Sequence, residues 1–478
     1  MNKFALILFS FITINSFSQE LVKNIRFKIP QKSDLFQIIE EDNKRVSLFF
    51  TNKIKTTSVR FDKDFNIIDS LSYIKPEKKF NEIVGYSISD NKYYTYWSAS
   101  NNKEFVSQCF DFSKKVTLQK SYTLDSGKEQ VIKKTTINNI FYLITITKNS
   151  NILNFYVFKD GNYSKRTVDM SERVFYDKEN KDAKLWSIFN TITTMENYFG
   201  LQTISNDSPA SLTFSGSKRK CYDYNNNFII TLDNNNQFTQ FISINLNDFS
   251  FNYQIFDQPK IIENVDASSD SNSFVLEKNI VQMNLNSDNL VIVVKDFNNQ
   301  DLKSYQAFDN KEIDFKNSEI YQENKSVKSV RVLDKSNQFL RKIYHLNPSL
   351  SCYSNNGVNY LTIGSVSSLE NNNNGAMMVG GMFGLAGALI AVALTSNYSM
   401  NNLNSYQGRK VVYINCMFDD NFNHINGDAK KLAFDKLRNF VEENKKLTSQ
   451  TIFKFDSALL FGGFNKETNY YSFYKFVD

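Results

Sequence analysis

Histidine and cysteine are scarce in this chain of 478 residues, and this limits the chemistry it can perform. Its only histidines, His345 and His424, exclude a multi-histidine metal centre, and a Ser-His-Asp triad would have to use one of them. Four cysteines are too few and too far apart to frame a protein of this size with disulfides; they are Cys109, Cys221, Cys352 and Cys416. We expect buried free thiols, and one disulfide is the alternative.

The chain also lacks the short motifs that hold phosphates, nucleophiles or metals. No CxxC, HExxH, GxSxG, GxxxxGK[ST] or GxGxxG stands in a fitting sequence context. The segment Asp62–Asn66 starts like a calcium loop, but it has no glycine at the sixth position and has Tyr73 at the twelfth, so it predicts a hairpin turn. We predict no catalytic residue, no metal ligand and no cofactor.

Neither sign of charge dominates the sequence. Lys and Arg number 56 and Asp and Glu number 50, which gives a formal net charge of +6 spread along the chain. There is no basic stripe of the kind that follows a phosphate backbone. Nucleic acid is therefore not a predicted partner, and the charge pattern leaves the ligand open.

The first eighteen residues have the three parts of a secretory signal peptide. A short basic start ends at Lys3, an apolar run covers Phe4–Ile14, and small residues stand at Ser16 and Ser18. The apolar run is too short to span a bilayer, which favours cleavage over anchoring. We predict that residues 1–18 are removed and that the protein is exported, to the periplasm or to the outer membrane and cell surface.

Proline and tryptophan are rare, whereas the chain has 43 Phe and 25 Tyr. From residue 34 to about 345, short β-branched or aromatic runs alternate with Asn and Asp turns, which is typical of all-β proteins. One turn recurs about every 40 to 50 residues, a period typical of propeller blades. Its copies are Phe61–Asn66, Phe110–Lys114, Phe158–Asn162, Leu246–Ser250, Lys295–Asn298, Leu333–Asn337 and Met417–Asn421. We predict an all-β, β-propeller-like fold with six or seven degenerate blades; tandem β-sandwiches are the alternative.

The organisation changes after residue 350, where eleven of the sixteen glycines lie. We divide the mature chain into a propeller-like body over 19–370, an uncharged insertion over 371–408, and closing strands with one amphipathic helix over 409–478. Val358–Ile363 and Lys410–Ile414 are predicted to be neighbouring strands of one blade on either side of the insertion. Leu21–Ile29 is predicted to close the ring, and the helix is expected to run from an N-cap at Asp428 to Val441.

The segment Gly375–Leu394 has twenty residues without a charged or strongly polar side chain. As a helix it would be about 30 Å long, the thickness of a bilayer's hydrocarbon core. Small residues spaced four apart form two rows on such a helix, and such rows let a second helix approach closely. This glycine-zipper face consists of Ala376, Gly380, Gly384, Gly387, Ala388 and Ala391.

Three hypotheses compete for this segment. It is a membrane-embedded helix that anchors the protein or binds copies of itself, a helix buried in protein, or a loop kept flexible by its glycines. The first is favoured, because five glycines in thirteen residues are costly in a helix exposed to water. A single stop-transfer helix, however, would separate the two strands predicted to pair on either side of it.

These patterns favour an exported, non-enzymatic binding or scaffold protein. Its predicted partners are a membrane or further copies of the chain, contacted through residues 375–394. The alternative is a secreted hydrolase acting on a polysaccharide or peptide, which should bring two carboxylates, or a histidine and an acid, together in a central pocket. A pore-forming assembly is a third possibility.

Overall fold

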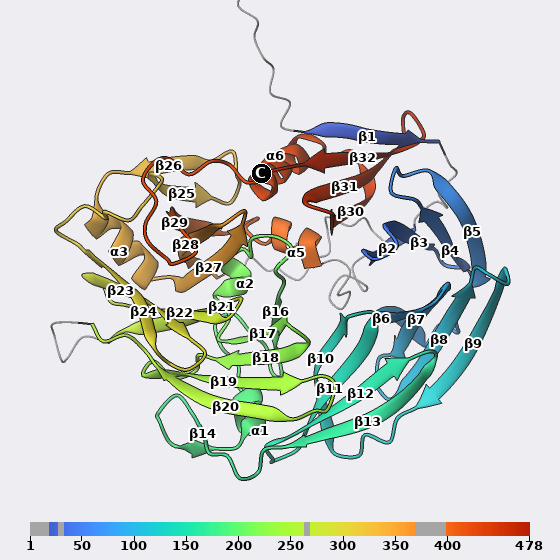
Figure 1. Cartoon of the computed structure of the whole chain (residues 1–478), viewed down its shortest axis with the longest axis horizontal. Coiled ribbons are helices and arrows are strands. Elements are labelled where there is room, and N and C mark those ends of the chain that lie inside the picture. Colours follow the sequence, from blue (N-terminus) through green and yellow to red (C-terminus); the bar gives the residue numbers. More distant parts are fainter. Residues whose placement is uncertain (1–18, 27–32, 262–267, 369–397) are drawn as a thin grey trace, which may run out of the picture.

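A computed structural model describes residues 19–26, 33–261, 268–368 and 398–478 of the chain. In these residues the strands form seven sheets of four or five strands, in which every pair but one is antiparallel, arranged as a ring around one axis (Figure 1). The predicted β-propeller is therefore correct, with seven blades. The predicted glycine-rich helix lies outside the described residues.

Each blade is one sheet, numbered here from the N-terminal side. Blade 1 comprises β2 (Asp34–Glu40), β3 (Arg45–Thr51), β4 (Lys55–Phe61) and β5 (Ile67–Ile74). Blade 2 comprises β6 (Phe80–Ser89), β7 (Lys92–Ala99), β8 (Glu104–Asp111) and β9 (Val116–Thr123). Blade 3 comprises β10 (Glu129–Ile137), β11 (Ile140–Thr147), β12 (Ile152–Lys159) and β13 (Asn162–Asp169). Blade 4 comprises β16 (Gln202–Ile204), β17 (Arg219–Tyr224), β18 (Asn227–Leu232), β19 (Phe238–Asn245) and β20 (Phe251–Asp257), and blade 5 comprises β21 (Asp270–Leu276), β22 (Asn279–Leu285), β23 (Asn289–Asp296) and β24 (Asp301–Phe308). Blade 6 comprises β25 (Ile320–Asn324), β26 (Val330–Leu333), β27 (Asn347–Asn355), β28 (Val358–Val366) and β29 (Lys410–Phe418), and blade 7 comprises β30 (Thr448–Phe455), β31 (Ala458–Asn465), β32 (Tyr470–Phe476) and β1 (Glu20–Ile25). A small hairpin of β14 (Phe175–Tyr176) and β15 (Asp182–Ala183) lies between blades 3 and 4 in the sequence.

The two ends of the chain close the ring together. The N-terminal strand β1 pairs antiparallel with β32 as the outermost strand of blade 7. The Ser472 hydroxyl adds a hydrogen bond of 2.6 Å to the Asn24 side chain. This is the closure predicted for the N-terminal segment, with the strand ending at Ile25.

The recurring turn of the sequence joins the last two strands in each of blades 1 to 5. In blade 1, Asp62 accepts hydrogen bonds from the backbone N–H groups of Asp64 and Asn66 at 2.9 and 2.8 Å. Asp296 and Asp419 hold their own turns in the same way. A short Asp side chain that caps its own turn explains why this residue recurs at blade spacing.

One predicted copy of this turn is wrong. Leu333–Asn337 leads from β26 into the helix α3 (Ser336–Tyr344) and forms no hairpin. Phe339, Leu340 and Ile343 of α3 are buried in the main hydrophobic cluster, so tertiary packing decides this segment. The Asp-Lys-Ser-Asn string has the composition of a turn, but it precedes a helix here.

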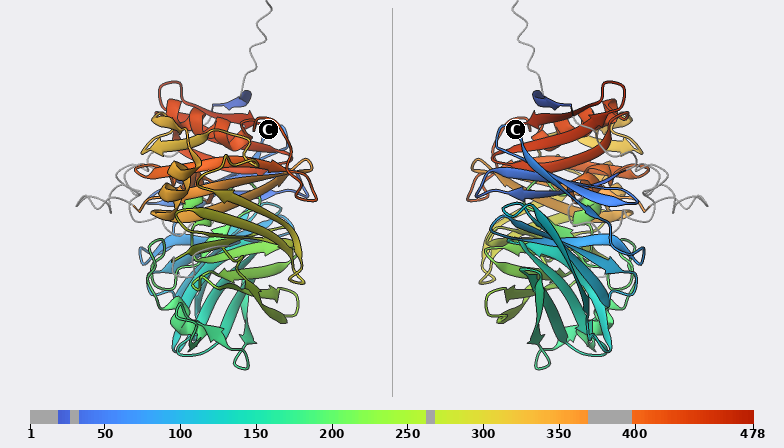
Figure 2. Two further views of the ribbon diagram at one scale, coloured as in Figure 1. Left: turned by 90° about the vertical axis from the view of Figure 1, so that its left-hand side faces the viewer. Right: turned by 90° about the vertical axis from the view of Figure 1, so that its right-hand side faces the viewer.

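The first strands of the blades run in the same direction along the ring axis. The turns that follow these strands contact one another in neighbouring blades, since Lys44 pairs with Asp456 and Arg45 donates to Asn91. The turns between first and second strands therefore lie on one face of the ring, here called the mouth face. The connections between second and third strands, and links such as that from β5 to β6, lie on the opposite face, here called the insertion face. Figure 2 shows the ring edge-on, between these two faces.

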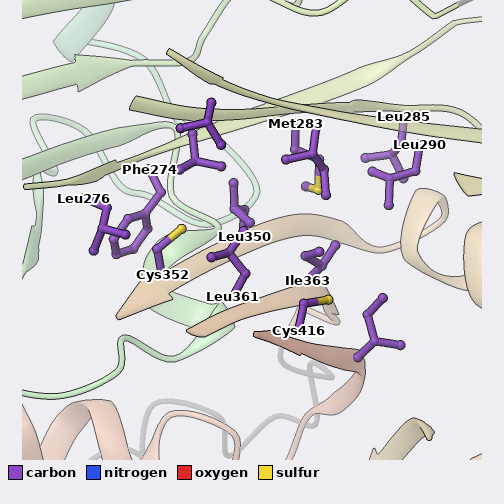
Figure 3. Close-up of a cluster of buried hydrophobic side chains, with 14 of the residues drawn as sticks. Phe274, Leu276, Met283, Leu285, Leu290, Leu350, Cys352, Leu361, Ile363 and Cys416 are labelled. Carbon is purple, nitrogen blue, oxygen red and sulfur yellow. The ribbon is translucent and has the colours of Figure 1, made fainter. Parts of the chain in front are cut away.

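The insertion is placed as the sequence predicts. Strands β28 and β29 pair antiparallel from Asn359–Phe418 to Val366–Val411, although residues 367–409 separate them in the sequence. Blades 5 and 6 share a hydrophobic interface around this pair, in which side chains of both sheets pack together (Figure 3). The labelled residues there are Phe274, Leu276, Met283, Leu285, Leu290, Leu350, Cys352, Leu361, Ile363 and Cys416.

All four cysteines are free and buried, as expected. Apart from α3, the described helices are α1 (Leu185–Phe189), α2 (Leu212–Ser215), α5 (Tyr398–Asn404) and α6 (Ala433–Glu443). The predicted C-terminal helix is α6, which packs Leu437 and Phe440 against blade 7. Its predicted N-cap at Asp428 is wrong, because the Ala429 N–H is already bonded to the carbonyl of Asn317 and the helix starts four residues later.

Candidate functional site

A cavity of about 1100 Å³ lies on the ring axis. The inner strands supply its wall, with residues from β2, β6, β10, β16, β17 and β30, and α5 lies at its inner end. Figure 1 looks along the axis and shows α5 in the middle of the ring. An axial cavity bounded by inner strands is where propellers present side chains from several blades to one ligand.

Hairpin turns form the mouth of this cavity. Asn138 and Asn139 of the β10–β11 turn have positive φ angles of 48° and 60°, which a two-residue hairpin turn requires and asparagine tolerates. The Asn138 amide donates to the Asn226 side chain in the turn of the next blade at 2.9 Å. On the other side, Lys44 forms an ion pair of 3.2 Å with Asp456 between blades 1 and 7. The turns therefore form a linked, carboxamide-rich rim.

At the floor of the cavity, hydrogen bonds join α5 and the residues just after it to the segment that precedes and begins α2. The buried amide of Asn402 accepts a hydrogen bond from the Ser211 N–H at 2.6 Å and donates one to the Pro209 carbonyl at 2.8 Å. The hydroxyl of Tyr406 accepts from the Leu212 N–H at 2.8 Å. These contacts join segments nearly 200 residues apart.

One extra strand narrows the channel at blade 4. The strand β16 pairs parallel with β17, with Thr203 opposite Cys221, and so adds a fifth strand on the inner edge of this blade. The Lys133 ammonium donates to the Leu201 carbonyl at 2.9 Å and ties the start of this strand to blade 3. The cavity is consequently bounded by irregular chain as well as by regular inner strands.

Two carboxylates, Asp207 and Asp223, face the cavity from blade 4. Desolvation by the surrounding protein raises the pKa of Asp223 to about 6, and the charge of Asp207 adds to this shift. The same Asp207 charge, after burial, helps to raise the pKa of Tyr86 to about 12. At pH 7 a carboxyl with such a pKa is still roughly 90% ionised. At this pH Asp223 therefore acts mainly as a hydrogen-bond acceptor.

An ion pair stands in the wall between blades 2 and 3. The Lys134 ammonium lies 3.4 Å from the Glu82 carboxylate, and both side chains are mostly buried. Burial raises the pKa of Glu82, whereas the Lys134 charge opposes that rise. Burial likewise lowers the pKa of Lys134. The lining of the cavity thus offers carboxylates, amides, hydroxyls and a partly neutralised lysine to a ligand.

The predicted site residues do not meet at this cavity. The glycine-zipper face, from Ala376 to Ala391, lies outside the described residues. Neither His345 nor His424 lines the cavity, and the His424 ring nitrogen lies 3.1 Å from the Asn317 side-chain oxygen in blade 6. Within the described ranges, no group of three or more His, Cys, Asp or Glu side chains is arranged to hold a metal ion. The helices in those ranges include none that is long and apolar enough to cross a membrane.

Sequence reasoning did not find Asp207, Asp223 or Asn402. Their segments are distant along the chain, and each occurs in an ordinary polar turn, strand or helix context. The only available signal was the loss of strand pattern between residues 184 and 216, where the chain enters the channel as α1, β16 and α2.

Comparisons with known proteins add little to this description. No family model and no curated protein matches the chain. Similar solved structures include a prolyl endopeptidase (7% identity over 91% of this chain and 46% of that chain, TM-score 0.34), a protein from Lactobacillus plantarum (6%, 68% and 79%, 0.26) and a mutant of AofleA from Arthrobotrys oligospora (8%, 73% and 84%, 0.24). This chain thus spans less than half the length of the endopeptidase chain. Such similarity carries no argument about function, and the chain is classed by its own sheets as a seven-bladed propeller with an axial cavity.

Proposed function

We propose that this protein is an exported binding protein that is held at a membrane and receives a saccharide ligand at the mouth of its axial cavity. The observation that carries the binding role is the cavity itself, which inner strands of several blades and α5 line with polar side chains. Side chains that several blades present to one cavity can contact a single ligand together.

The lining supports a hydroxyl-rich ligand. Its polar groups include the amides of Asn138, Asn139 and Asn206 and the carboxylates of Asp207 and Asp223. Amides and carboxylates match the paired donors and acceptors of sugar hydroxyls, and the rings of tyrosines such as Tyr86 offer flat contact surfaces. The cavity volume of about 1100 Å³ lies at the upper end of the range usual for ligand sites.

Attachment at the membrane is proposed from the sequence of Gly375–Leu394. The pairing of β28 with β29 supports a specific form of it, in which both flanks of the segment stay on the same side of the bilayer. A single pass across the inner membrane is incompatible with that pairing. Insertion from the periplasmic side, or association with the outer membrane, is compatible with it.

The binding role is tested on a glycan array with the fluorescently labelled mature protein. We expect selective binding to some saccharides, and the double variant Asp207→Asn/Asp223→Asn should weaken it about tenfold or more, because each charged hydrogen bond contributes roughly 1.5–3 kcal/mol. The matched control is Asp62→Asn, in a turn at the outer edge of blade 1. Absence of binding to every saccharide, or equal loss in the control, would contradict the proposal.

A secreted hydrolase acting on a polysaccharide remains the second candidate, because Asp207 and Asp223 share one cavity and the charge of Asp207 helps to raise the pKa of Asp223. A hydrolase of this kind needs one carboxyl to donate a proton and the other to act as base or nucleophile. Incubating the mature protein with each bound saccharide at pH 5.5 and pH 7.5 separates the two roles. Cleavage that is faster at the lower pH and abolished by Asp223→Asn would favour the hydrolase over the binding protein.

A further inference from the structure

Two exposed isoleucines lie side by side on the insertion face of blade 1. Ile54 is in the β3–β4 turn and Ile74 ends β5, and each is 71% exposed. The Ile54 carbonyl accepts a hydrogen bond from the N–H of Lys75 at 2.8 Å, so the β3–β4 turn and the end of β5 are held together. Paired, exposed isoleucines at the tip of a blade are an apolar surface without a partner in the described chain.

Lysines surround these isoleucines. Five of them are exposed in the neighbouring turns of blades 1 and 2, namely Lys53, Lys55, Lys78, Lys79 and Lys103. The acidic residues in the same turns are Glu77 and Glu104, and Lys79 pairs with Glu104 at 2.9 Å. Positive charge therefore remains in excess around Ile54 and Ile74.

A second apolar tip stands on the same face. Ile192 and Tyr198, which are 60% and 58% exposed, belong to the link that precedes β16. The buried guanidinium of Arg219 holds this link by donating to the carbonyls of Ile188, Phe189, Thr191 and Asn197. The same link lines the cavity through Met195 and Asn197.

The described chain on either side of the insertion also lies on this face. The described chain stops just after β28, where the Arg409 guanidinium donates to the Ser367 carbonyl at 2.7 Å, and resumes at Tyr398 in the cavity floor. The described residues on both sides of the insertion, Ser367 and Arg409, therefore lie on the face that carries the exposed isoleucines.

We infer that the insertion face of the propeller docks on an anionic lipid surface, with Ile54 and Ile74 entering the headgroup region and the surrounding lysines contacting lipid phosphates. Aliphatic side chains flanked by lysines bind such surfaces by combining apolar burial with electrostatic attraction. The docked protein points its cavity mouth away from the membrane, toward a ligand in solution. This inference rests on the membrane attachment proposed above and adds the orientation of the body.

Strand β5 offers a matched pair of probes, because its two ends lie on opposite faces. Ile74 is at the insertion face, whereas Ile67, 44% exposed, is at the mouth face. The native cysteines are all buried, so an introduced surface cysteine is labelled selectively. The mature full-length variants Ile74→Cys and Ile67→Cys, each labelled with an environment-sensitive nitrobenzoxadiazole dye, are mixed with vesicles of equal parts phosphatidylcholine and phosphatidylglycerol.

We expect flotation of the protein with these vesicles, a blue-shifted and several-fold brighter emission from the dye at position 74, and an unchanged emission from the dye at position 67. Vesicles of phosphatidylcholine alone should bind less protein. Bound protein in which neither dye responds, or both respond equally, overturns the docking face but leaves membrane attachment standing. Failure of the wild-type chain to float with either vesicle overturns both.

Discussion

Ile363 of β28 lies directly opposite Ile414 of β29, and both side chains are fully buried. The chain between them contains the whole uncharged insertion. Because these two residues must be on the same side of any membrane, residues 398–478 cannot be separated from the preceding blades by a single crossing. The pair therefore excludes Gly375–Leu394 as a single membrane crossing between the two parts of the body.

The Ile363–Ile414 pair is predicted to contribute strongly to the stability of blade 6. Ile363→Ala should lower the free energy of unfolding by about 2–5 kcal/mol, because it removes buried methylenes from a closely packed interface. Urea denaturation monitored by circular dichroism measures this change. The control Ile68→Ala, on the exposed edge of blade 1, should stay within about 0.5 kcal/mol of wild type. Equal effects would mean that the blade 5–6 interface is not packed as described.

A buried ion pair between Lys220 and Asp233 in blade 4 predicts that substitutions at these two residues have non-additive effects on stability. The two charges lie 2.7 Å apart with both side chains fully buried, and Asn272 also accepts from the lysine. Asp233→Leu should cost about 3–5 kcal/mol, because it leaves an uncompensated buried ammonium. The double variant Lys220→Met/Asp233→Leu should recover most of that loss in the same urea experiment. A double variant as unstable as the single one would contradict the pairing.

The raised pKa of Asp223 predicts a pH-dependent loss of stability. Its folded pKa of about 6 exceeds the ordinary value of 3.8, so the folded state binds this proton more tightly than the unfolded state. Stability therefore falls as pH rises from about 4 to about 6, and the deficit persists above that range. Asp223→Asn should match wild type near pH 4 and exceed it near pH 7. Comparing urea midpoints of the two proteins at both pH values checks the sign, and an asparagine variant that is less stable at pH 7 would contradict it.

The glycine-zipper face predicts self-association in detergent. Replacing Gly384 with leucine fills the row of small residues and should block close helix approach. Mild-detergent size analysis of the membrane extract should show an oligomer for wild type and a smaller species for Gly384→Leu. The control Met382→Leu changes a residue outside the row and should leave the oligomer intact. A wild-type monomer in mild detergent would refute self-association, though not attachment.

Much of the fold was predictable because it depends on local patterns. Short alternating runs specify strands, and aspartates such as Asp62 and Asp296 cap the turns that recur once per blade. The pairing across the insertion was also predictable, since Val358–Ile363 and Lys410–Ile414 are the only strong strand patterns on either side of an uncharged stretch. In these places local preference and tertiary structure agree.

The cavity was not predictable from the same patterns. Asn402 matters because it meets Pro209 and Ser211, and no local signal links a polar residue in a short helix to a loop almost 200 residues earlier. Asp207 and Asp223 similarly come together only through the parallel pairing of β16 with β17, which brings a link segment into the channel. The helix start at Ala433 was missed for a related reason, because a contact with Asn317 holds Ala429 outside the helix.

The central claim is that residues 375–394 hold an otherwise self-contained propeller at a membrane. The most direct test compares the fractionation of the wild-type chain with that of a variant in which residues 371–396 are replaced by a Gly-Ser linker of equal length, which keeps α5 and its hydrogen bond with Ser211. Circular dichroism and thermal unfolding establish that the variant keeps the β-rich fold. We predict that wild type sediments with membranes and resists extraction by high salt, whereas the linker variant is released as a folded soluble protein. Wild-type protein that fractionates as fully soluble, with and without the segment, would contradict the account.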